Sequence, residues 1–178
     1  MIKRIVLTGA HGTGKTTVLN MFKEGGYPVI TEVVRKLARE KGIKINEMGD
    51  DEAQKMIFNT YLKEFEADEF VSDRGLTDVM AYTLYLVNKG KCQTGLLESQ
   101  LNELKNFKVR NSDIAYFYFP IEFELEDDGV RSIDPEFQRD IDKNLKTILK
   151  EAGINYFLVH GTPEERFQQI VDLVGVNL

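Results

Sequence analysis

Cysteine is almost missing from this chain of 178 residues. Cys92 is the only example, so the chain cannot form an internal disulfide or a cysteine-rich metal cluster, and it suits a reducing compartment. Positive charge is also scarce, since 23 Lys and Arg residues stand against 29 Asp and Glu residues, for a net charge of −6. We therefore expect no broad basic surface for nucleic acid or an anionic membrane, although a local basic groove is compatible with this composition.

Long apolar runs, internal repeats and low-complexity segments are missing as well. No apolar stretch approaches the length that spans a bilayer, and no linker interrupts the chain. The first residues lead directly into a predicted strand and lack the long apolar region and cleavage site of a signal peptide. We expect a cytoplasmic protein without a membrane segment, folded as a single domain over residues 1–178.

Glycine is concentrated in one stretch, GAHGTGKTT at residues 9–17, which contains three glycines. This stretch fits the pattern G-x-x-x-x-G-K-[ST], with Gly9, Gly14, Lys15 and Thr16 in the fixed places. An apolar segment at residues 5–7 comes before it, and apolar residues at helical spacing follow it. The motif therefore lies between a strand and a helix, which is the context that a phosphate-binding loop needs.

Each part of this motif has a task in phosphate binding. Glycine lets the backbone curl so that consecutive N–H groups point at phosphate oxygens, and the helix N-terminus adds partial positive charge. Lys15 can then reach the β- and γ-phosphates, and the Thr16 hydroxyl can hold Mg²⁺. We expect no catalytic role for His11, which occupies a variable position of the loop. The predicted nucleotide-binding residues are Gly9, His11, Gly12, Thr13, Gly14, Lys15, Thr16 and Thr17.

Strand and helix patterns alternate along the rest of the chain, which predicts an α/β fold with a parallel sheet covered by helices on both faces. The predicted strands cover residues 3–8, 27–31, 69–72, 114–119 and 155–160. An acidic stretch with weak periodicity, at about residues 121–134, is predicted to form a loop or lid. Ligands bind at the carboxyl ends of the strands in such sheets, so the residues after each strand are the candidates for a site.

Glu32 follows the second predicted strand directly. A carboxylate at that position could accept a proton from an attacking hydroxyl, and Arg35, three residues later on the same helix face, could hold an anionic part of an acceptor. The alternative is a glutamate that stabilises a helix N-terminus beside a solvated arginine. The phosphate-binding loop favours the functional interpretation, with both residues in contact with the substrate.

Asp73 and Arg74 end the third predicted strand. An acid at this place could hold Mg²⁺ directly or through water, as the Walker-B acid does. The alternative is an ion pair that stabilises the turn. Asp78 could contact the acceptor, and a solvated helix residue is an equal alternative there. We therefore predict Thr16 and Asp73 as metal ligands, and Arg74 and Asp78 as substrate residues.

Arg131 lies in the predicted lid, with Arg139 as a second choice in the helix that follows. An arginine that closes over the transferred phosphoryl group would neutralise its charge and exclude water. A surface counter-charge to the neighbouring acidic residues is the alternative for Arg131. Those acids lack metal-ligand spacing and are interpreted as a solvated edge.

Four segments together resemble a known group of proteins: GAHGTGKTT, ITEVVR, SDRGLTD and DDGVRS. They are similar to the small P-loop kinase-like AAA-type ATPases grouped with the nicotinamide riboside kinase domain, and more distantly to deoxynucleoside and thymidylate kinases. The resemblance implies a three-layer P-loop NTPase fold whose parallel strands are ordered 2-3-1-4-5. It also implies that Lys15 and Thr16 bind phosphate and Mg²⁺, that Glu32 and Asp73 serve the metal or the acceptor hydroxyl, and that Arg131 closes on the γ-phosphate.

The sequence thus favours a kinase that uses ATP and Mg²⁺ to phosphorylate a nucleoside, a nucleotide or a similar small metabolite. A kinase acting on a hydroxymethylated base in DNA is a second interpretation, which the acidic composition disfavours. A nucleotide-binding switch without a small-molecule acceptor is a third. The chain lacks the [NT]-K-x-D motif that reads guanine, which favours ATP over GTP. The identity of the acceptor and the oligomeric state do not follow from the sequence.

Overall fold

The computed structural model describes residues 3–124 and 134–175, and its centre is a five-stranded parallel sheet. The strands are ordered β2-β3-β1-β4-β5, which confirms the predicted fold class and strand order. Leu7 in β1 lies opposite Asp73 in β3 and Phe117 in β4, so the central strands end at the same level. The strands are β1 (Arg4–Thr8), β2 (Val29–Ile30), β3 (Phe70–Asp73), β4 (Ile114–Tyr118) and β5 (Phe157–Leu158).

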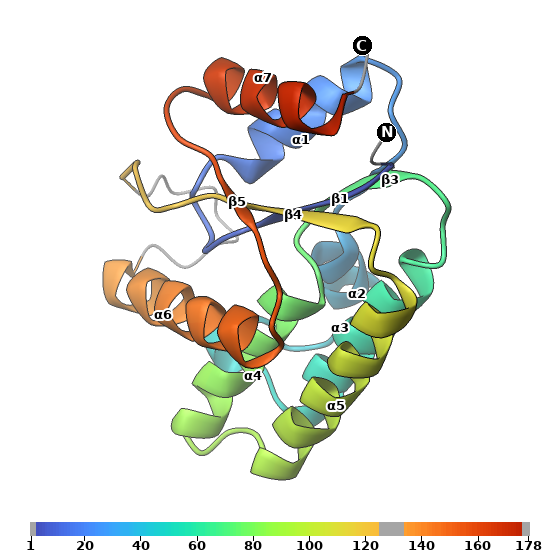
Figure 1. Ribbon diagram of the computed structural model, residues 1–178. Coiled ribbons are helices and arrows are strands. Elements are labelled where there is room, and N and C mark those ends of the chain that lie inside the picture. The colour runs from blue at the N-terminus through green and yellow to red at the C-terminus, as the bar shows by residue number, and fades with distance from the viewer. Residues whose placement is uncertain (1–2, 125–133, 176–178) are drawn as a thin grey trace.

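Helices cover both faces of the sheet, as Figure 1 shows. Two of them, α1 (Lys15–Glu24) and α7 (Pro163–Val174), lie together on one face. The other face carries α2 (Val33–Lys41), α3 (Asp51–Glu64), α4 (Leu76–Asn88), α5 (Thr94–Arg110) and α6 (Pro135–Glu151), with a short 3-10 turn, η1 (Asn46–Met48). None of the helices in the described part of the chain combines the length and the apolar character needed to cross a bilayer.

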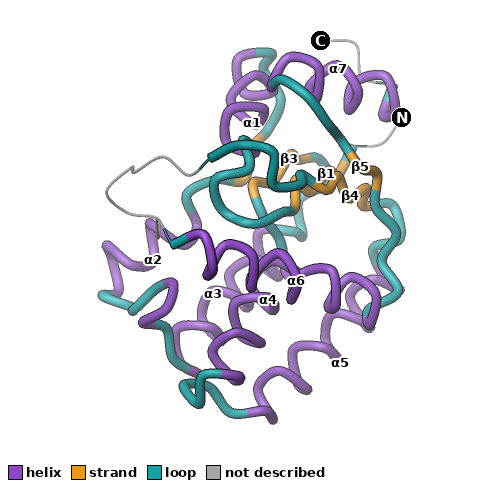
Figure 2. Tube along the Cα trace, turned by 90° about the vertical axis from the view of Figure 1, so that its left-hand side faces the viewer, coloured by secondary structure: helices purple, strands orange, loops and turns teal. Residues whose placement is uncertain are grey.

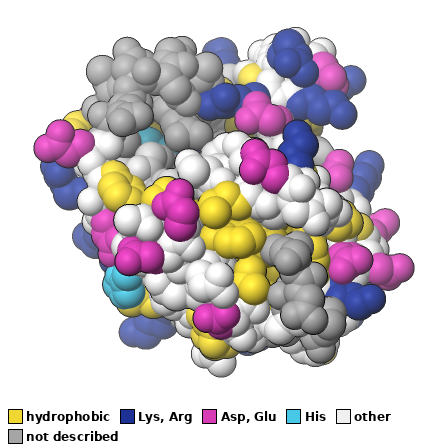
Figure 3. All heavy atoms as spheres, turned by 90° about the horizontal axis from the view of Figure 1, so that it is seen from above, with side chains coloured by type: hydrophobic (Ala, Val, Ile, Leu, Met, Phe, Trp, Pro, Cys, Tyr) yellow, Lys and Arg dark blue, Asp and Glu magenta, His cyan; other side chains and the backbone are white. Residues whose placement is uncertain are grey.

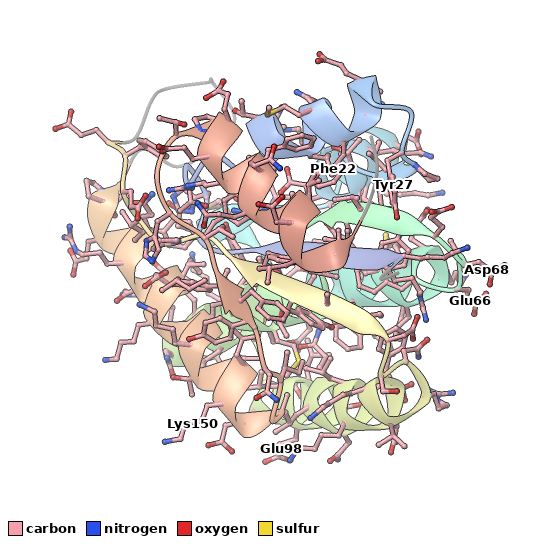
Figure 4. All side chains as sticks on the ribbon, turned by 45° about the horizontal axis from the view of Figure 1, so that its top comes forward. Phe22, Tyr27, Glu66, Asp68, Glu98 and Lys150 are labelled. Carbon is pink, nitrogen blue, oxygen red and sulfur yellow. The ribbon has the colours of Figure 1, made fainter. Side chains whose placement is uncertain are left out.

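Strand β1 divides the hydrophobic core in two because its side chains alternate between the faces. Ile5 and Leu7 point into the smaller core beneath α1 and α7, and Val6 points into the larger core on the other side. In the smaller core, Phe22 of α1 packs against Phe167 of α7, with ring centroids 4.8 Å apart, and lies beside Tyr27 (Figure 4). On the outer side of these two helices, acidic and basic side chains are intermixed (Figure 3).

Local sequence signals explain where several helices begin. The Asp50 carboxylate accepts a hydrogen bond from the Ala53 N–H at 2.9 Å, and Thr162 forms a reciprocal capping box with Glu165.

The two edge strands, β2 and β5, are shorter than the sequence predicts, since each pairs with only one neighbour. Within the predicted lid, residues 125–133 lie outside the described residues.

Candidate functional site

The phosphate-binding motif forms a tight loop between β1 and α1, at the edge of the sheet that Figure 2 faces. Gly9 has φ of 147°, and a Cβ there would lie 2.5 Å from the carbonyl oxygen of Phe119, so only glycine fits. Gly14 has φ of 85° where the chain enters α1. The loop surrounds a hollow of about 310 Å³, lined by His11, Gly12, Thr13, Gly14, Lys15, Thr16 and Thr17 together with Asp73 and Arg74.

Lys15 folds back over this loop instead of pointing into solvent. Its ammonium group donates to the carbonyl oxygens of Gly9 at 2.8 Å and Ala10 at 2.6 Å, and to the Thr13 hydroxyl at 3.1 Å. The residue is only 4% exposed. A buried ammonium group held by the carbonyls of a glycine-rich loop is placed to meet an anion bound in the same loop.

Thr16 and Asp73 bring the loop and strand β3 together. The Thr16 hydroxyl donates to Oδ2 of Asp73 at 2.6 Å. The other carboxylate oxygen, Oδ1, is buried without a hydrogen-bond partner among the described residues. Such an oxygen needs a donor or a cation, and Mg²⁺ is commonly held by one carboxylate together with phosphate oxygens and water. The described residues contain no group of three or more His, Cys, Asp or Glu side chains that could hold a metal without a nucleotide.

Two residues at strand ends adopt the left-handed conformation without being glycine. Glu32, the residue before α2, has φ of 59°, and Arg74, the residue after β3, has φ of 80°. This conformation is unfavourable for a residue with a Cβ, and residues that adopt it are found most often at functional sites. Around Arg74 it is enforced by two hydrogen bonds: its N–H donates to the Leu7 carbonyl at 3.0 Å, and its carbonyl accepts from the Ser72 hydroxyl at 2.6 Å.

Three of the four predicted substrate residues, Glu32, Arg35 and Arg74, line one pocket of about 510 Å³ beside the loop, whereas Asp78 does not. Glu32 and Arg35 come from the start of α2, where their charged groups lie 3.7 Å apart. Thr16, Asp73 and Arg74 reach the same pocket from the loop and from β3. Its lining is Thr16, Glu32, Val33, Val34, Arg35, Ile45, Asn46, Tyr61, Asp73 and Arg74.

A second, deeper pocket of about 340 Å³ shares five lining residues with the first, among them Tyr61 and Arg74. The Arg74 guanidinium lies 5.4 Å from the centroid of the Tyr82 ring, and the Tyr61 hydroxyl donates to the Asp73 carbonyl at 3.3 Å. Burial raises the pKa of both tyrosines, so both hydroxyls stay protonated at neutral pH. The lining combines apolar side chains with amides: Val34, Ile45, Asn46, Gln54, Ile57, Tyr61, Arg74, Asp78, Val79 and Tyr82.

The sequence left two interpretations of Asp78 open: a residue that contacts the acceptor, and a solvated helix residue. The structure excludes the second, because Asp78 is only 3% exposed. One carboxylate oxygen accepts from the Thr8 hydroxyl at 2.8 Å and from the Gly75 N–H at 3.0 Å, and the other accepts from the Gly9 N–H at 3.2 Å. Burial raises the pKa of this carboxyl group, while Lys15 lowers it. Asp78 thus ties β1, the phosphate-binding loop and the start of α4 together, and its contact with an acceptor stays a prediction.

Neither of these two pockets is lined by His11 or Arg139. The His11 imidazole lies 3.3 Å from the Tyr82 hydroxyl and packs on Phe137, and the His11 carbonyl accepts from Gln138 at 2.7 Å. These contacts join the loop to α4 and α6. Arg131 lies outside the described residues, and Arg139 is exposed near the start of α6.

Sequence reasoning missed Arg166, which is completely buried on α7. Its guanidinium donates to the Thr13 carbonyl of the loop at 2.6 Å and to the Glu122 carboxylate at 2.6 Å. Glu122 also contacts His160 at 2.7 Å, so this exposed acid has two ion-pair partners, which the sequence did not reveal. One signal was present: Arg166 lies four residues before Ile170 and eight before Val174, on the buried face of the helix.

Comparison with solved structures finds the same fold in several nucleotide-related proteins. NadR protein in complex with NR has a TM-score of 0.75 at 17% identity, and the match covers 99% of this chain and 53% of that one. Deoxyadenosine kinase from M. mycoides with bound dATP has a TM-score of 0.66 at 14% identity, covering 98% and 100%. Thymidylate kinase from Candida albicans has a TM-score of 0.58 at 16% identity, covering 97% and 91%.

This chain therefore spans about half of the NadR chain and nearly all of the two kinases. The comparison with curated proteins found no match by sequence. A family model described as an AAA domain, AAA_28, matches residues 4–166, which include every described element except the part of α7 after its first turn. The resemblance noted in the sequence is thus confirmed: the chain belongs to this family of AAA domains and has the fold of the P-loop kinases.

Proposed function

We propose that this protein is a kinase that uses ATP and Mg²⁺ to phosphorylate a nucleoside, a nucleotide or a similar small metabolite. One observation carries the proposal: a single pocket joins the Thr16–Asp73 pair to Glu32, Arg35 and Arg74. A protein that only holds a nucleotide has no need of a carboxylate and two arginines in a pocket next to the γ-phosphate position. A phosphotransferase needs them to place and activate an acceptor.

The loop and Lys15 would bind the triphosphate. The main-chain N–H groups of the loop would contact the phosphate oxygens. The Lys15 ammonium would exchange its carbonyl partners for the β- and γ-phosphates. Thr16 and Oδ1 of Asp73, which has no hydrogen-bond partner among the described residues, fit Mg²⁺, which when bound would neutralise charge on the phosphates. Arg131 would add charge neutralisation from the lid, as the resemblance implies.

Glu32 would receive the proton of the attacking hydroxyl. Its carboxylate is half-exposed at the mouth of the pocket, with Arg35 beside it to hold an anionic part of the acceptor. The deeper pocket would take the body of the acceptor. Apolar side chains, two tyrosine rings and two amides suit a flat, polar-edged ring such as a nucleobase. The product dCMP in a similar structure of deoxyadenosine kinase from M. mycoides supports a nucleoside-type acceptor.

The test incubates the protein with ATP, Mg²⁺ and pools of nucleosides and nucleotides, and measures ADP release. We expect release that depends on one pool and that is lost in Lys15→Ala, whose fold survives by circular dichroism. Lys150→Ala is the control, because Lys150 points outward at the far end of α6 (Figure 4). Turnover without any acceptor would favour the switch, and labelled phosphate on a hydroxymethylated DNA polymer would favour the DNA kinase.

A further inference from the structure

We propose that Arg166 is a positioning residue for the phosphate-binding loop: by holding the Thr13 carbonyl, it sets the direction in which the next main-chain N–H points. The contact is direct, with the guanidinium Nη1 donating to the Thr13 carbonyl oxygen at 2.6 Å. The inference rests on the proposed function only as far as the loop binds phosphate.

The peptide between Thr13 and Gly14 links this contact to the ligand side of the loop. In a trans peptide the C=O and N–H bonds point in opposite directions. The Thr13 carbonyl points toward α7, so the Gly14 N–H points away from α7, back toward the hollow that both residues line. Because Gly14 has φ of 85° and no Cβ, this peptide could rotate easily without an anchor.

The guanidinium of Arg166 is itself held rigidly. It lies over two aromatic rings, 5.3 Å from the centroid of Phe119 and 4.9 Å from that of Phe123. Its second nitrogen donates to Glu122 at 2.6 Å, and Glu122 in turn accepts from the Gly161 N–H at 3.0 Å. A planar cation that stacks and forms two bonds at fixed angles is a role that lysine fills poorly.

The cation also acts on the peptide that it contacts. A hydrogen bond from a charged donor to a carbonyl polarises the peptide and strengthens its N–H as a donor. Glu122, which is itself exposed, balances the charge of Arg166, so burying the guanidinium costs less than burying a lone cation would. The geometry therefore gives Arg166 a role that does not require contact with the nucleotide: it fixes the direction of the Gly14 N–H in the phosphate-binding loop and strengthens this group as a hydrogen-bond donor.

The test measures the affinities for Mg²⁺-tripolyphosphate and Mg²⁺-ATP by calorimetry. Tripolyphosphate has no base, so its affinity reports on the phosphate-binding loop alone. We expect Arg166→Met to weaken both ligands by the same factor, about tenfold to hundredfold, as for the loss of a charged hydrogen bond. Arg166→Lys should retain the charge and still lose at least about threefold, and it replaces the Met variant if that one fails to fold.

Phe167→Leu is the matched control, since Phe167 is the next residue on α7 and packs on Phe22 instead of the loop. It should destabilise the fold while leaving tripolyphosphate affinity within about twofold of the wild type. The proposal is overturned if both Arg166 variants bind tripolyphosphate as the wild type does, or if Phe167→Leu weakens binding equally. Neither measurement needs an acceptor or turnover, so failure of the kinase assay would leave this test intact.

Discussion

Removing the Asp78 carboxylate should destabilise the fold strongly, although this side chain lies at the edge of the candidate site. Its two oxygens accept hydrogen bonds from the main-chain N–H groups of Gly9 and Gly75 and from the Thr8 hydroxyl. Asp78→Ala leaves two buried N–H groups without an acceptor, and each costs about 1–3 kcal/mol. The raised pKa of Asp78 shows that burial of the ionised carboxylate has a cost, and removing it offsets part of this loss.

We therefore expect Asp78→Ala to lower the free energy of unfolding by about 2–4 kcal/mol, a large part of the 5–15 kcal/mol that is typical of a domain. Asp78→Asn keeps one acceptor oxygen and should cost about half as much. Urea denaturation at neutral pH, followed by circular dichroism, measures the difference. Asp68→Ala is the control, because Asp68 points into solvent (Figure 4) and should change stability by less than about 0.5 kcal/mol. An Asp78→Ala variant as stable as that control would refute the reasoning.

Three further predictions concern the site and its surroundings. Glu32→Gln should lower the turnover number at least about tenfold while ATP affinity changes less than about twofold, because the proposed role of this carboxylate is to accept the proton of the attacking hydroxyl; loss of ATP affinity alone would contradict this role. The pKa of Glu122 is lowered to about 2, chiefly by its hydrogen bond with His160. Because the folded pKa lies below the ordinary 4.5, this carboxylate stabilises the fold above that pH, and the contribution disappears as the pH falls toward about 2. The stability difference between wild type and Glu122→Gln should therefore shrink between about pH 5 and pH 3, and a constant difference would rule the mechanism out. Burial raises the pKa of the Cys92 thiol to about 12, so alkylation by iodoacetamide at neutral pH should be slow in the folded protein and fast in urea, and equal rates would show an accessible thiol.

The sequence predicts the centre of the site because the relevant signals are local. The phosphate-binding loop is a contiguous motif, and Asp73 follows a short apolar strand directly. Their meeting follows from the geometry of parallel sheets, whose strands end at one edge, and the contact between Thr16 and Asp73 at 2.6 Å agrees with it. The strand order came from the resemblance and could not be worked out from periodicity alone.

The periphery of the site depends on contacts between distant segments, and a single sequence does not reveal these. Arg166 meets Thr13 across 153 positions and Glu122 across 44. Glu122 lies in a run of acids, most of which suggest a solvated edge, and nothing local distinguishes the one that forms an ion pair. The sequence left two interpretations of Asp78 open for the same reason, since its partner Thr8 belongs to a distant part of the chain.

The separation between Thr13 and Arg166 also bears on how the molecule is made. The ribosome produces the glycine-rich segment 153 positions before Arg166, the side chain that anchors it. A nascent chain that has emerged only as far as β4 already has the whole motif but not the helix that holds its Thr13 carbonyl. During synthesis, tight binding of a triphosphate should therefore become possible only after α7 has docked beside α1.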